Sequence, residues 1–316
     1  MRALPLLIVL LGYLQTKGQT ATILVLGADS QVGLELGARA RQLGVPLHAA
    51  RRGEVDIVDA AQVGAAIARI SPSLLVNTAA YTDVDRAEVE IDEAFRANAT
   101  GPGIVAAQCA QARVALLHIS TDYVFDGAKP TAYTEDDPVA PLNVYGRSKA
   151  EGETAVRRSL ARHVILRTSW IYGIYGTNFL KTMMRLARER DELRIVDDQR
   201  GSPTGSADIA EAILGIARRV AADESAWGTY HFAGAGVTSW HGFAAEIVAA
   251  QAAVTDRRPD VVAIATCEYP RPARRPANSA LDCSRFVQTF GVRAADWRER
   301  TRGVVAALLD RSSTRQ

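Results

Sequence analysis

Thr22-Ile-Leu-Val-Leu-Gly-Ala-Asp-Ser-Gln-Val-Gly33 is the stretch that decides the fold of this chain. Its apolar run has the length of a buried strand and ends at Gly27, and a segment with helical periodicity follows from Val32 to Leu43. A strand that turns through glycine directly into a helix is typical of a βαβ unit. The pattern therefore predicts a parallel sheet covered by helices.

The same alternation continues along the first half of the chain. Further strands are predicted at 45–49, 74–77, 114–119 and 164–167, and further helices at 60–70, 91–113 and 144–162. Strands and helices that alternate at this spacing form βαβ units with helices on both faces of the sheet. We expect an α/β fold with a doubly wound, Rossmann-like parallel sheet.

The rhythm loosens after about residue 170. Helices are predicted at 183–190 and 207–222 and a strand at 227–233, and the remaining sequence up to Asp282 is expected to be rich in loops. We predict a Rossmann-like NAD(P)-binding domain over 21–170. Residues 171–316 are expected to form mainly a smaller substrate-binding lobe at the carboxyl ends of the strands, where open α/β sheets bind ligands.

Composition excludes several classes of protein. The 316 residues are 48% hydrophobic and 23% charged with a formal net charge of +2, which excludes a disordered tail, a collagen and a multi-span membrane protein. No long Lys/Arg run is present, so we expect no nucleic-acid partner. The three cysteines form no C-x-x-C pair, and this usage fits a reducing compartment, the cytoplasm.

Residues 1–20 are treated as an N-terminal extension. The apolar run from Leu4 to Leu14 is too short to span a bilayer, which needs about 20 residues, so no membrane span is expected. It is either a signal-like segment, which leaves a secretory alternative open, or a non-native extension.

The turn after the first strand has the features of a phosphate site. Gly27 and Gly33 leave backbone N–H groups accessible at the positive end of a helix. Ser30 stands where a glycine is expected, and its hydroxyl is small and able to donate to a phosphate. The second strand then leads into Arg51 and Arg52, which suit a 2′-phosphate and favour NADPH over NADH.

Thr121, Tyr145 and Lys149 form the strongest chemical signal. Tyr145 and Lys149 lie four residues apart and hence on one face of a helix, where the ammonium is expected to lower the pKa of the phenol. Thr121 ends a predicted strand, so its hydroxyl can reach a substrate carbonyl oxygen.

Longer motifs resemble one family of the extended short-chain dehydrogenase/reductases. The stretches Asn77-Thr-Ala-Ala-Tyr-Thr-Asp-Val-Asp-Arg-Ala-Glu88, Ser120-Thr-Asp-Tyr-Val-Phe-Asp-Gly127, Pro141-Leu-Asn-Val-Tyr-Gly146 and Arg275-Pro-Ala-Asn-Ser-Ala-Leu-Asp282 are similar to those of the dTDP-4-dehydrorhamnose reductase family, and the match runs from Thr22 to about Asp310. Ser30, the extra N-terminus and Gly176-Thr-Asn178 depart from its pattern.

The resemblance implies a reaction and a set of roles. The family reduces the C4 keto group of dTDP-4-dehydro-6-deoxy-L-mannose with NADPH, NADH being an alternative, and forms dTDP-L-rhamnose. By resemblance, Tyr145 is the proton donor, Lys149 tunes it and also holds the cofactor, and Thr121 orients the keto oxygen. The remaining implied contacts are Ser30, Gln31 and Val32 for the phosphates, Asp56 and Ile57 for the adenine side, Ala79, Ala80 and Tyr81 for the nicotinamide half, and Val84, Asp122 and Trp170 for the sugar.

Several alternatives stay open at this point. Another nucleotide-sugar epimerase or reductase of the superfamily is one rival, and a non-catalytic NADP-binding subunit resembling the methionine adenosyltransferase β subunit is another. The five histidines show no metal-ligand spacing, so no metal site is predicted, and a single Glu35 does not establish Mg²⁺ at a homodimer contact. Arg271, Arg274 and Arg275 either pair with the nucleotide diphosphate or are solvated.

Overall fold

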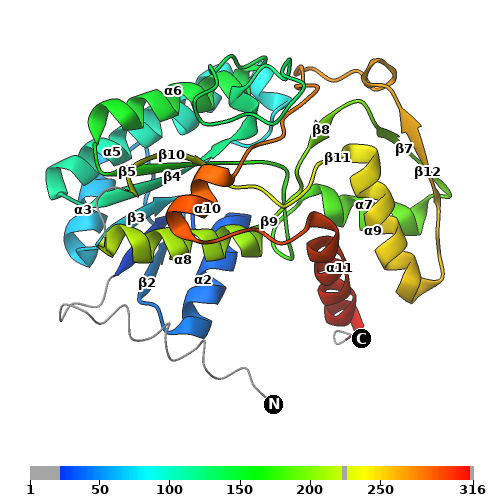
Figure 1. Cartoon of the computed structure of the whole chain (residues 1–316). Helices are drawn as coiled ribbons and strands as arrows, with labels where there is room; N and C mark the ends of the chain where they lie inside the picture. The colour runs from blue at the N-terminus through cyan, green and yellow to red at the C-terminus, as the bar shows by residue number, and fades with distance from the viewer. Residues whose placement is uncertain (1–21, 223–225, 314–316) are drawn as a thin grey trace.

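A six-stranded parallel sheet forms the centre of the molecule (Figure 1). The computed structural model describes residues 22–222 and 226–313, so the extension predicted at 1–20 lies outside the described residues. The strands are β1 (Ile23–Leu26), β2 (Leu47–Ala50), β3 (Leu74–Asn77), β4 (Ala115–Thr121), β5 (His163–Thr168) and β10 (Gly228–His231). Their order is β2-β1-β3-β4-β5-β10, and every pairing is parallel.

Helices cover both faces of this sheet, which confirms the predicted doubly wound fold (Figure 1). One face carries α3 (Ala60–Ile70), α5 (Gly101–Ala112) and α6 (Val144–Ser159), and the other carries α2 (Gln31–Leu43), α8 (Ser206–Ala222) and α10 (Ser284–Phe290). Each face encloses its own apolar core, built on alternate residues of the strands. Because β1 has β2 on one side and β3 on the other, the strand order reverses there, and the crevice opens at that point.

The helix predicted over 91–113 is interrupted. It consists of α4 (Ile91–Phe95), a π-helical turn η2 (Arg96–Thr100) and α5. Pro102 has no N–H to donate to the carbonyl of Asn98, four residues earlier, so the regular pattern cannot continue through it. That carbonyl is approached closely by α6, because a Cβ built on Gly152 would lie 2.0 Å from it. The helix predicted over 144–162 is shorter than expected and ends at Ser159.

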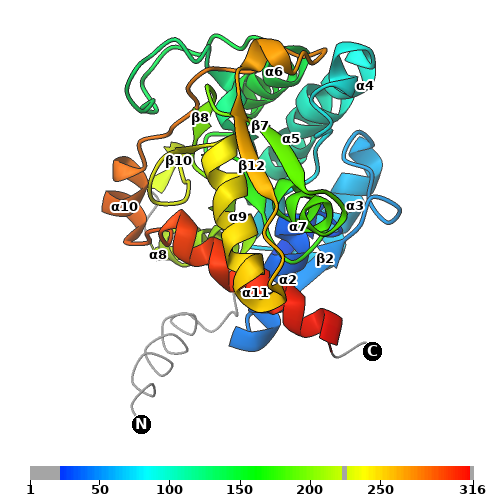
Figure 2. The ribbon, with the colours of Figure 1, turned by 90° about the vertical axis from the view of Figure 1, so that its right-hand side faces the viewer.

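The second lobe has more regular structure than predicted (Figure 2). Helices α7 (Phe179–Glu189), α9 (Trp240–Thr255) and α11 (Trp297–Ser313) pack around one apolar cluster, beside β7 (Glu192–Val196) paired with β12 (Asp260–Ile264). Helix α9 and the strands β7 and β12 were not predicted, so the expectation that the remaining sequence up to Asp282 is rich in loops is wrong. Short elements complete the fold: β6 (Ile171–Tyr172), β8 (Arg200–Gly201), β9 (Thr204–Gly205), β11 (Thr238–Ser239), η1 (Arg86–Glu88), η3 (Asp122–Val124) and η5 (Thr266–Glu268).

The chain passes between the two lobes more than once. Strand β10 comes from the second half of the sequence but pairs with β5 in the central sheet, and α8 packs against α2. The division predicted at residue 170 stays a prediction. None of the helices in the described ranges is long and apolar enough to cross a membrane.

Candidate functional site

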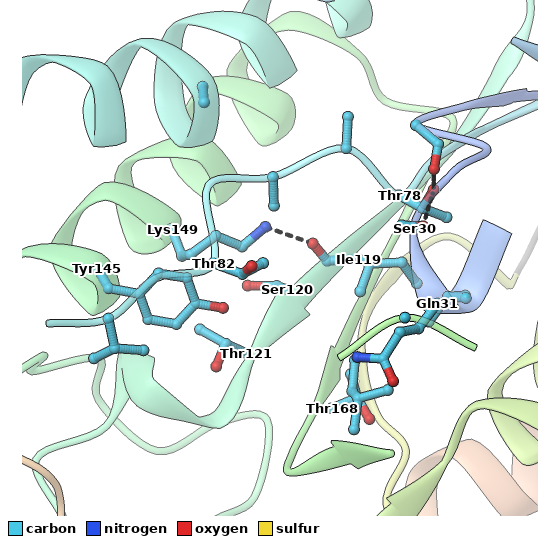
Figure 3. Close-up of a pocket in the computed structure, with 18 of the residues that line it drawn as sticks. Ser30, Gln31, Thr78, Thr82, Ile119, Ser120, Thr121, Tyr145, Lys149 and Thr168 are labelled. Atoms are coloured by element: carbon cyan, nitrogen blue, oxygen red, sulfur yellow. Dashed lines mark hydrogen bonds between the residues drawn. The ribbon is translucent and has the colours of Figure 1, made fainter. Parts of the chain in front are cut away.

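A cavity of about 700 Å³ lies at the carboxyl ends of the strands. Its walls come from the turn after β1, the end of β3, the end of β4, helix α6 and the segment that leads into the second lobe (Figure 3). The volume falls within the range of roughly 300–1,000 Å³ that is typical of small-molecule sites. Its position at the reversal of strand order is where open α/β sheets bind ligands.

The turn after β1 is built for close backbone approach. Gly27 has a φ of 75°, and a Cβ built on it would lie 2.5 Å from the Ala79 nitrogen at the end of β3. Gly33 is closed in as well, since its Cβ would lie 2.7 Å from the Ala28 Cα. Only glycine fits both positions without moving the neighbouring backbone. The two residues therefore hold the turn and the sheet together.

Ser30 is used by the protein itself. Its hydroxyl oxygen accepts a hydrogen bond of 3.0 Å from the Gly33 nitrogen and so caps α2, and its hydrogen is donated to Thr78 Oγ1 at 3.0 Å (Figure 3). In this arrangement both the oxygen and the hydrogen of the hydroxyl are used within the protein, and the contact with a phosphate expected from the sequence stays a prediction. The first-turn N–H groups of Gln31 and Val32, which the helix itself does not use, stay the predicted phosphate donors.

Two arginines and two carboxylates surround one end of the cavity. Arg52 lies 3.3 Å from Glu93, while Arg96 lies 3.4 Å from Asp56 and 3.7 Å from Glu93. All four line the cavity beside Ile57. Guanidinium groups bind phosphate oxygens and carboxylates bind ribose hydroxyls, so this end is equipped for the adenosine part of a dinucleotide.

Tyr145 and Thr121 lie close together in the wall of the cavity (Figure 3). Burial raises the pKa of Tyr145 to about 12; a hydrogen bond with Thr121 opposes the rise and the Asp122 carboxylate adds to it. Lys149 is not among the groups that act on this pKa, so the lowering predicted from the Tyr–Lys spacing is not found. Thr121 Oγ1 also donates to Asp122 Oδ1 at 3.0 Å.

Asp122 is itself unusual. It is 2% exposed, and burial raises its pKa to about 7, although hydrogen bonds with Ser279 and Thr121 oppose the rise. Its Oδ2 makes no hydrogen bond of ordinary geometry with any residue in the described part of the chain. Strongly shifted, incompletely paired carboxyl groups in a cleft are typical of functional sites.

Lys149 is fully enclosed between helix and sheet. Its side chain is 2% exposed, and Nζ donates a hydrogen bond of 2.6 Å to the carbonyl oxygen of Ile119 (Figure 3). Burial lowers its pKa to about 8, and the charge of Glu153 one turn further along α6 opposes that lowering. An amine that titrates near neutral pH can both give and take a proton there.

A buried ion pair supports the strand end from behind. The Glu153 carboxylate accepts two hydrogen bonds from Arg167, of 2.8 and 2.7 Å, and one of 2.6 Å from the Ser120 hydroxyl. These contacts hold the pKa of Glu153 below its usual value despite complete burial. The pair fixes α6, β4 and β5 relative to one another and thereby fixes the position of Thr121 next in sequence.

Aromatic rings form the wall on the second lobe. Trp170 has a φ of 46°, an uncommon value for a bulky residue, and its ring stacks on Trp240 with the centroids 3.6 Å apart. Gly201 also lies against the Trp170 ring, since a Cβ there would come within 2.5 Å of it. Both tryptophans line the cavity.

Known proteins share this architecture over nearly the whole chain. The family model described as RmlD substrate binding domain matches residues 21–309. A dTDP-4-dehydrorhamnose reductase of Sinorhizobium fredii is 46% identical over 90% of this chain and 97% of the relative, and one of Aggregatibacter actinomycetemcomitans is 42% identical over 90% and 99%. The chain belongs to the dTDP-4-dehydrorhamnose reductase family. A Bacillus anthracis dTDP-4-dehydrorhamnose reductase solved in complex with NADP superposes with a TM-score of 0.84, at 34% identity over 91% of this chain and 99% of that one.

Most of the residues predicted from the sequence line the one cavity. They are Gly27, Ser30, Gln31, Val32, Arg52, Asp56, Ile57, Ala79, Ala80, Val84, Thr121, Asp122, Tyr145, Lys149 and Trp170. Three others do not line it. Gly33 packs beneath the turn, Arg51 is exposed, with its backbone nitrogen bonded to Glu54, and the Tyr81 hydroxyl donates to Glu90 at 2.8 Å. The ligand contacts assigned to these residues within the family pattern stay predictions.

The structure also adds residues that sequence reasoning missed. Arg96, Glu93, Ser120, Thr168, Asn178 and Trp240 all line the cavity. The Asn178 amide donates 2.9 Å hydrogen bonds to Gln31 Oε1 and to the Gly173 carbonyl. These bonds join the second lobe to the first turn of α2, directly after β1. Spacing carried no signal for Arg96, which lies in the interrupted helix. Trp240 begins α9, which was not predicted as a helix.

Arg271 and Arg275 are not simply solvated. Both guanidinium groups pair with the Asp85 carboxylate, whose pKa is lowered to about 2 by these hydrogen bonds and by one of 3.2 Å from the Ala273 nitrogen, although burial opposes the shift. Asp85 directly follows Val84 in the cavity wall. The family motifs around Asp85 and Arg275, far apart in sequence, are therefore one structural unit beside the site.

The residues present fit a nicotinamide dinucleotide. The glycine turn after β1, the first-turn N–H groups of Gln31 and Val32 and the charged adenosine end line one cavity together with Tyr145 and Lys149. The charged end corresponds to the adenosine of such a cofactor, and the turn with its N–H groups corresponds to the pyrophosphate. The part lined by Tyr145 and Lys149 corresponds to the nicotinamide riboside.

Proposed function

We propose that this chain catalyses the NADPH-dependent reduction of the C4 keto group of dTDP-4-dehydro-6-deoxy-L-mannose to give dTDP-L-rhamnose. The observation that carries the proposal is the convergence of Thr121, Tyr145 and Lys149 in a cavity whose lining fits a nicotinamide dinucleotide. Membership of the family, at 46% identity to a relative named for this reaction, supports the substrate. NADH stays an alternative cofactor, and the NADP complex of a 34% identical relative favours NADPH.

The mechanism assigns a separate task to each side chain. NADPH, when bound, supplies the hydride for C4. Thr121 donates a hydrogen bond to the keto oxygen and holds it beside the Tyr145 hydroxyl. Tyr145 releases its proton to that oxygen; its raised pKa keeps the phenol protonated at neutral pH, as an acid requires. Lys149 then returns a proton to Tyr145, for which a pKa of about 8 is suited.

Asp122 and the stacked tryptophans are proposed to contact the sugar. The raised pKa of Asp122 leaves a fraction of the carboxyl groups protonated at neutral pH, so Oδ2 can donate to a sugar oxygen. Trp170 and Trp240 offer apolar surface to the deoxyhexose. A homodimer and a cytoplasmic location stay predictions.

The test is NADPH oxidation in the presence of the keto-sugar, followed by nicotinamide absorbance. We expect turnover in the wild type and a loss of roughly 10²- to 10⁴-fold in kcat for Tyr145→Phe, with NADPH binding retained. Tyr230→Phe, in the core on β10 and outside the cavity lining, is the control and should keep its turnover. NADPH binding with no turnover of the keto-sugar in the wild type would reject the reaction and favour a non-catalytic subunit.

A further inference from the structure

A chain of buried polar groups runs behind Lys149, on the side away from the cavity. Asn77 ends β3, and His118 lies directly opposite it in the register of β4. The Asn77 amide nitrogen is 3.2 Å from His118 Nδ1, and His118 Nε2 is 3.5 Å from Lys149 Nζ. Asn77 and His118 are completely buried, and His118 does not line the cavity. The mechanism above does not use either residue.

The orientation of Asn77 is set by the backbone. The Ala79 nitrogen donates a 3.1 Å hydrogen bond to Asn77 Oδ1, which only the carbonyl oxygen of the amide can accept. The Nδ2 group, which has only hydrogens to offer, is therefore the one that faces His118. His118 Nδ1 must accept this hydrogen bond with its lone pair.

The proton of the imidazole then has only one place. Burial holds the pKa of His118 well below its ordinary value, so the ring is neutral and carries a single N–H. With Nδ1 as an acceptor, that N–H is at Nε2 and faces Lys149 Nζ. An ammonium has three donors and no acceptor, so it cannot use this hydrogen, whereas a neutral amine has a lone pair that can.

We propose that His118 is a positioning residue whose Nε2–H tautomer, fixed through Asn77 by the Ala79 amide, stabilises the neutral amine of Lys149. The neutral amine is the form left when Lys149 has passed a proton to Tyr145. It keeps its 2.6 Å hydrogen bond to the Ile119 carbonyl, gains one from His118, and is reloaded by a proton from solvent. The strand thus supports both protonation states of Lys149, and this inference rests on the proposed function only for its kinetic part.

Few charged groups surround this pair. Glu153 on α6 faces Lys149 and favours its ammonium, but Arg167 on β5 neutralises that carboxylate. His163 on β5 acts weakly on His118 and has its own pKa lowered by burial. Asp122 and Thr121 act on Tyr145 instead. The tautomer of His118 is therefore the local feature that favours the neutral amine beyond burial itself.

The first test observes the tautomer directly and needs no activity. Nitrogen-15 NMR of the wild-type imidazoles distinguishes a protonated from a bare ring nitrogen, and the spectrum of His118→Phe identifies the His118 signals among the five histidines. We expect Nε2 protonated and Nδ1 bare at neutral pH. A proton on Nδ1, or on both nitrogens, would overturn the proposal.

The second test uses the pH profile of kcat at saturating NADPH and keto-sugar. Activity should fall as pH rises through the pKa of Lys149, because the ammonium is the proton source. In His118→Phe the neutral amine loses its hydrogen bond, so the falling limb should move up by roughly half to one pH unit. His241→Phe, on α9 of the second lobe, where the ring donates to the Val261 carbonyl, should leave the limb in place.

The two tests separate the possible failures. A limb that does not move in His118→Phe, or moves equally in His241→Phe, would reject the role of His118 while leaving the reaction intact. Absence of turnover in the wild type at every pH would reject the proposed function, and the NMR result would still decide the tautomer. If His118→Phe does not fold, the wild-type spectrum, assigned by titration and selective labelling, remains decisive.

Discussion

Replacing Gly27 by Ala tests the close contact between the phosphate turn and the sheet. Two separate penalties apply at this position. The φ of 75° destabilises a residue with a Cβ by about 1–2 kcal/mol. About 0.4–1 kcal/mol of this is offset because alanine lowers the conformational entropy of the unfolded chain relative to glycine. The added Cβ also lies 2.5 Å from the Ala79 nitrogen, and overpacking against backbone costs a further 1–3 kcal/mol, roughly. The sum is about 1–5 kcal/mol.

Two other glycines provide matched controls for these terms. Gly44 ends α2 with a φ of 66° and has no atom within 4 Å of a built Cβ, so Gly44→Ala carries only the backbone penalty of about 1 kcal/mol. Gly53 has neither a positive φ nor a neighbour within 4 Å, so Gly53→Ala should be close to neutral.

Thermal unfolding followed by circular dichroism measures the difference. For 316 residues, an unfolding entropy of roughly 2.1 cal/mol/K per residue converts each kcal/mol into about 1.5 °C of Tm. We expect Gly27→Ala to lose about 2–7 °C, Gly44→Ala about 1–2 °C and Gly53→Ala under about 1 °C. NADPH titration should show weakened binding for Gly27→Ala alone. Equal Tm losses at Gly27 and Gly44 would refute the close approach of Gly27 to β3.

Three further predictions concern charged groups. Glu153→Gln leaves a buried guanidinium without its counter-charge and should lower the free energy of unfolding, measured in urea, by about 3–5 kcal/mol. Glu189→Gln, in an exposed ion pair, is the control and should lower it by under about 1 kcal/mol. Similar losses in the two variants would contradict the buried pair. Asp85 has a pKa of about 2 in the folded protein against an ordinary 3.8, so its contribution to stability is present above about pH 4 and is lost as pH falls through 2. The urea midpoints of wild type and Asp85→Asn should therefore differ at neutral pH and converge in acid. A difference that stays constant with pH would contradict the ion pairs. Arg52→Ala should raise the KM for NADPH roughly tenfold more than that for NADH, while Arg51→Ala, outside the cavity lining, should change neither; equal effects of the two variants would remove Arg52 from the 2′-phosphate site.

Local sequence rules recovered the elements whose signals are local. The helix predicted over 60–70 and the strand predicted over 74–77 have the observed bounds, because an Asp59 cap and a short apolar run mark them in the chain. Helix α9 was missed for the opposite reason. Its Ala-rich sequence is apolar nearly all round, so it shows little helical periodicity, and its neighbours are rich in Gly and Pro.

In the site, too, the sequence predicted the features with local patterns and missed those that depend on distant residues. A glycine turn and a Tyr-x-x-x-Lys spacing are local patterns, and both led to residues that line the cavity. The partner of Asp85 is about 190 positions away, and the contact of Lys149 is a carbonyl oxygen, which no residue type signals. The pKa of Tyr145 is raised, whereas the sequence predicted that Lys149 would lower it, because burial outweighs the charges around the phenol. Burial is a tertiary property that spacing does not reveal.

Helix α6 shows how a spacing of four residues carries more than the two catalytic groups. Tyr145, Lys149 and Glu153 follow one another at successive turns on the face that meets the sheet, so the helix presents an acid, an amine and a carboxylate in a column. Only the first two face the cavity, and the third is locked to Arg167 on β5. Because a helix is rigid along its axis, fixing Glu153 at the base fixes the height of Tyr145 two turns above it. Loss of the buried ion pair should therefore reduce kcat as well as stability, although neither of its side chains lines the cavity.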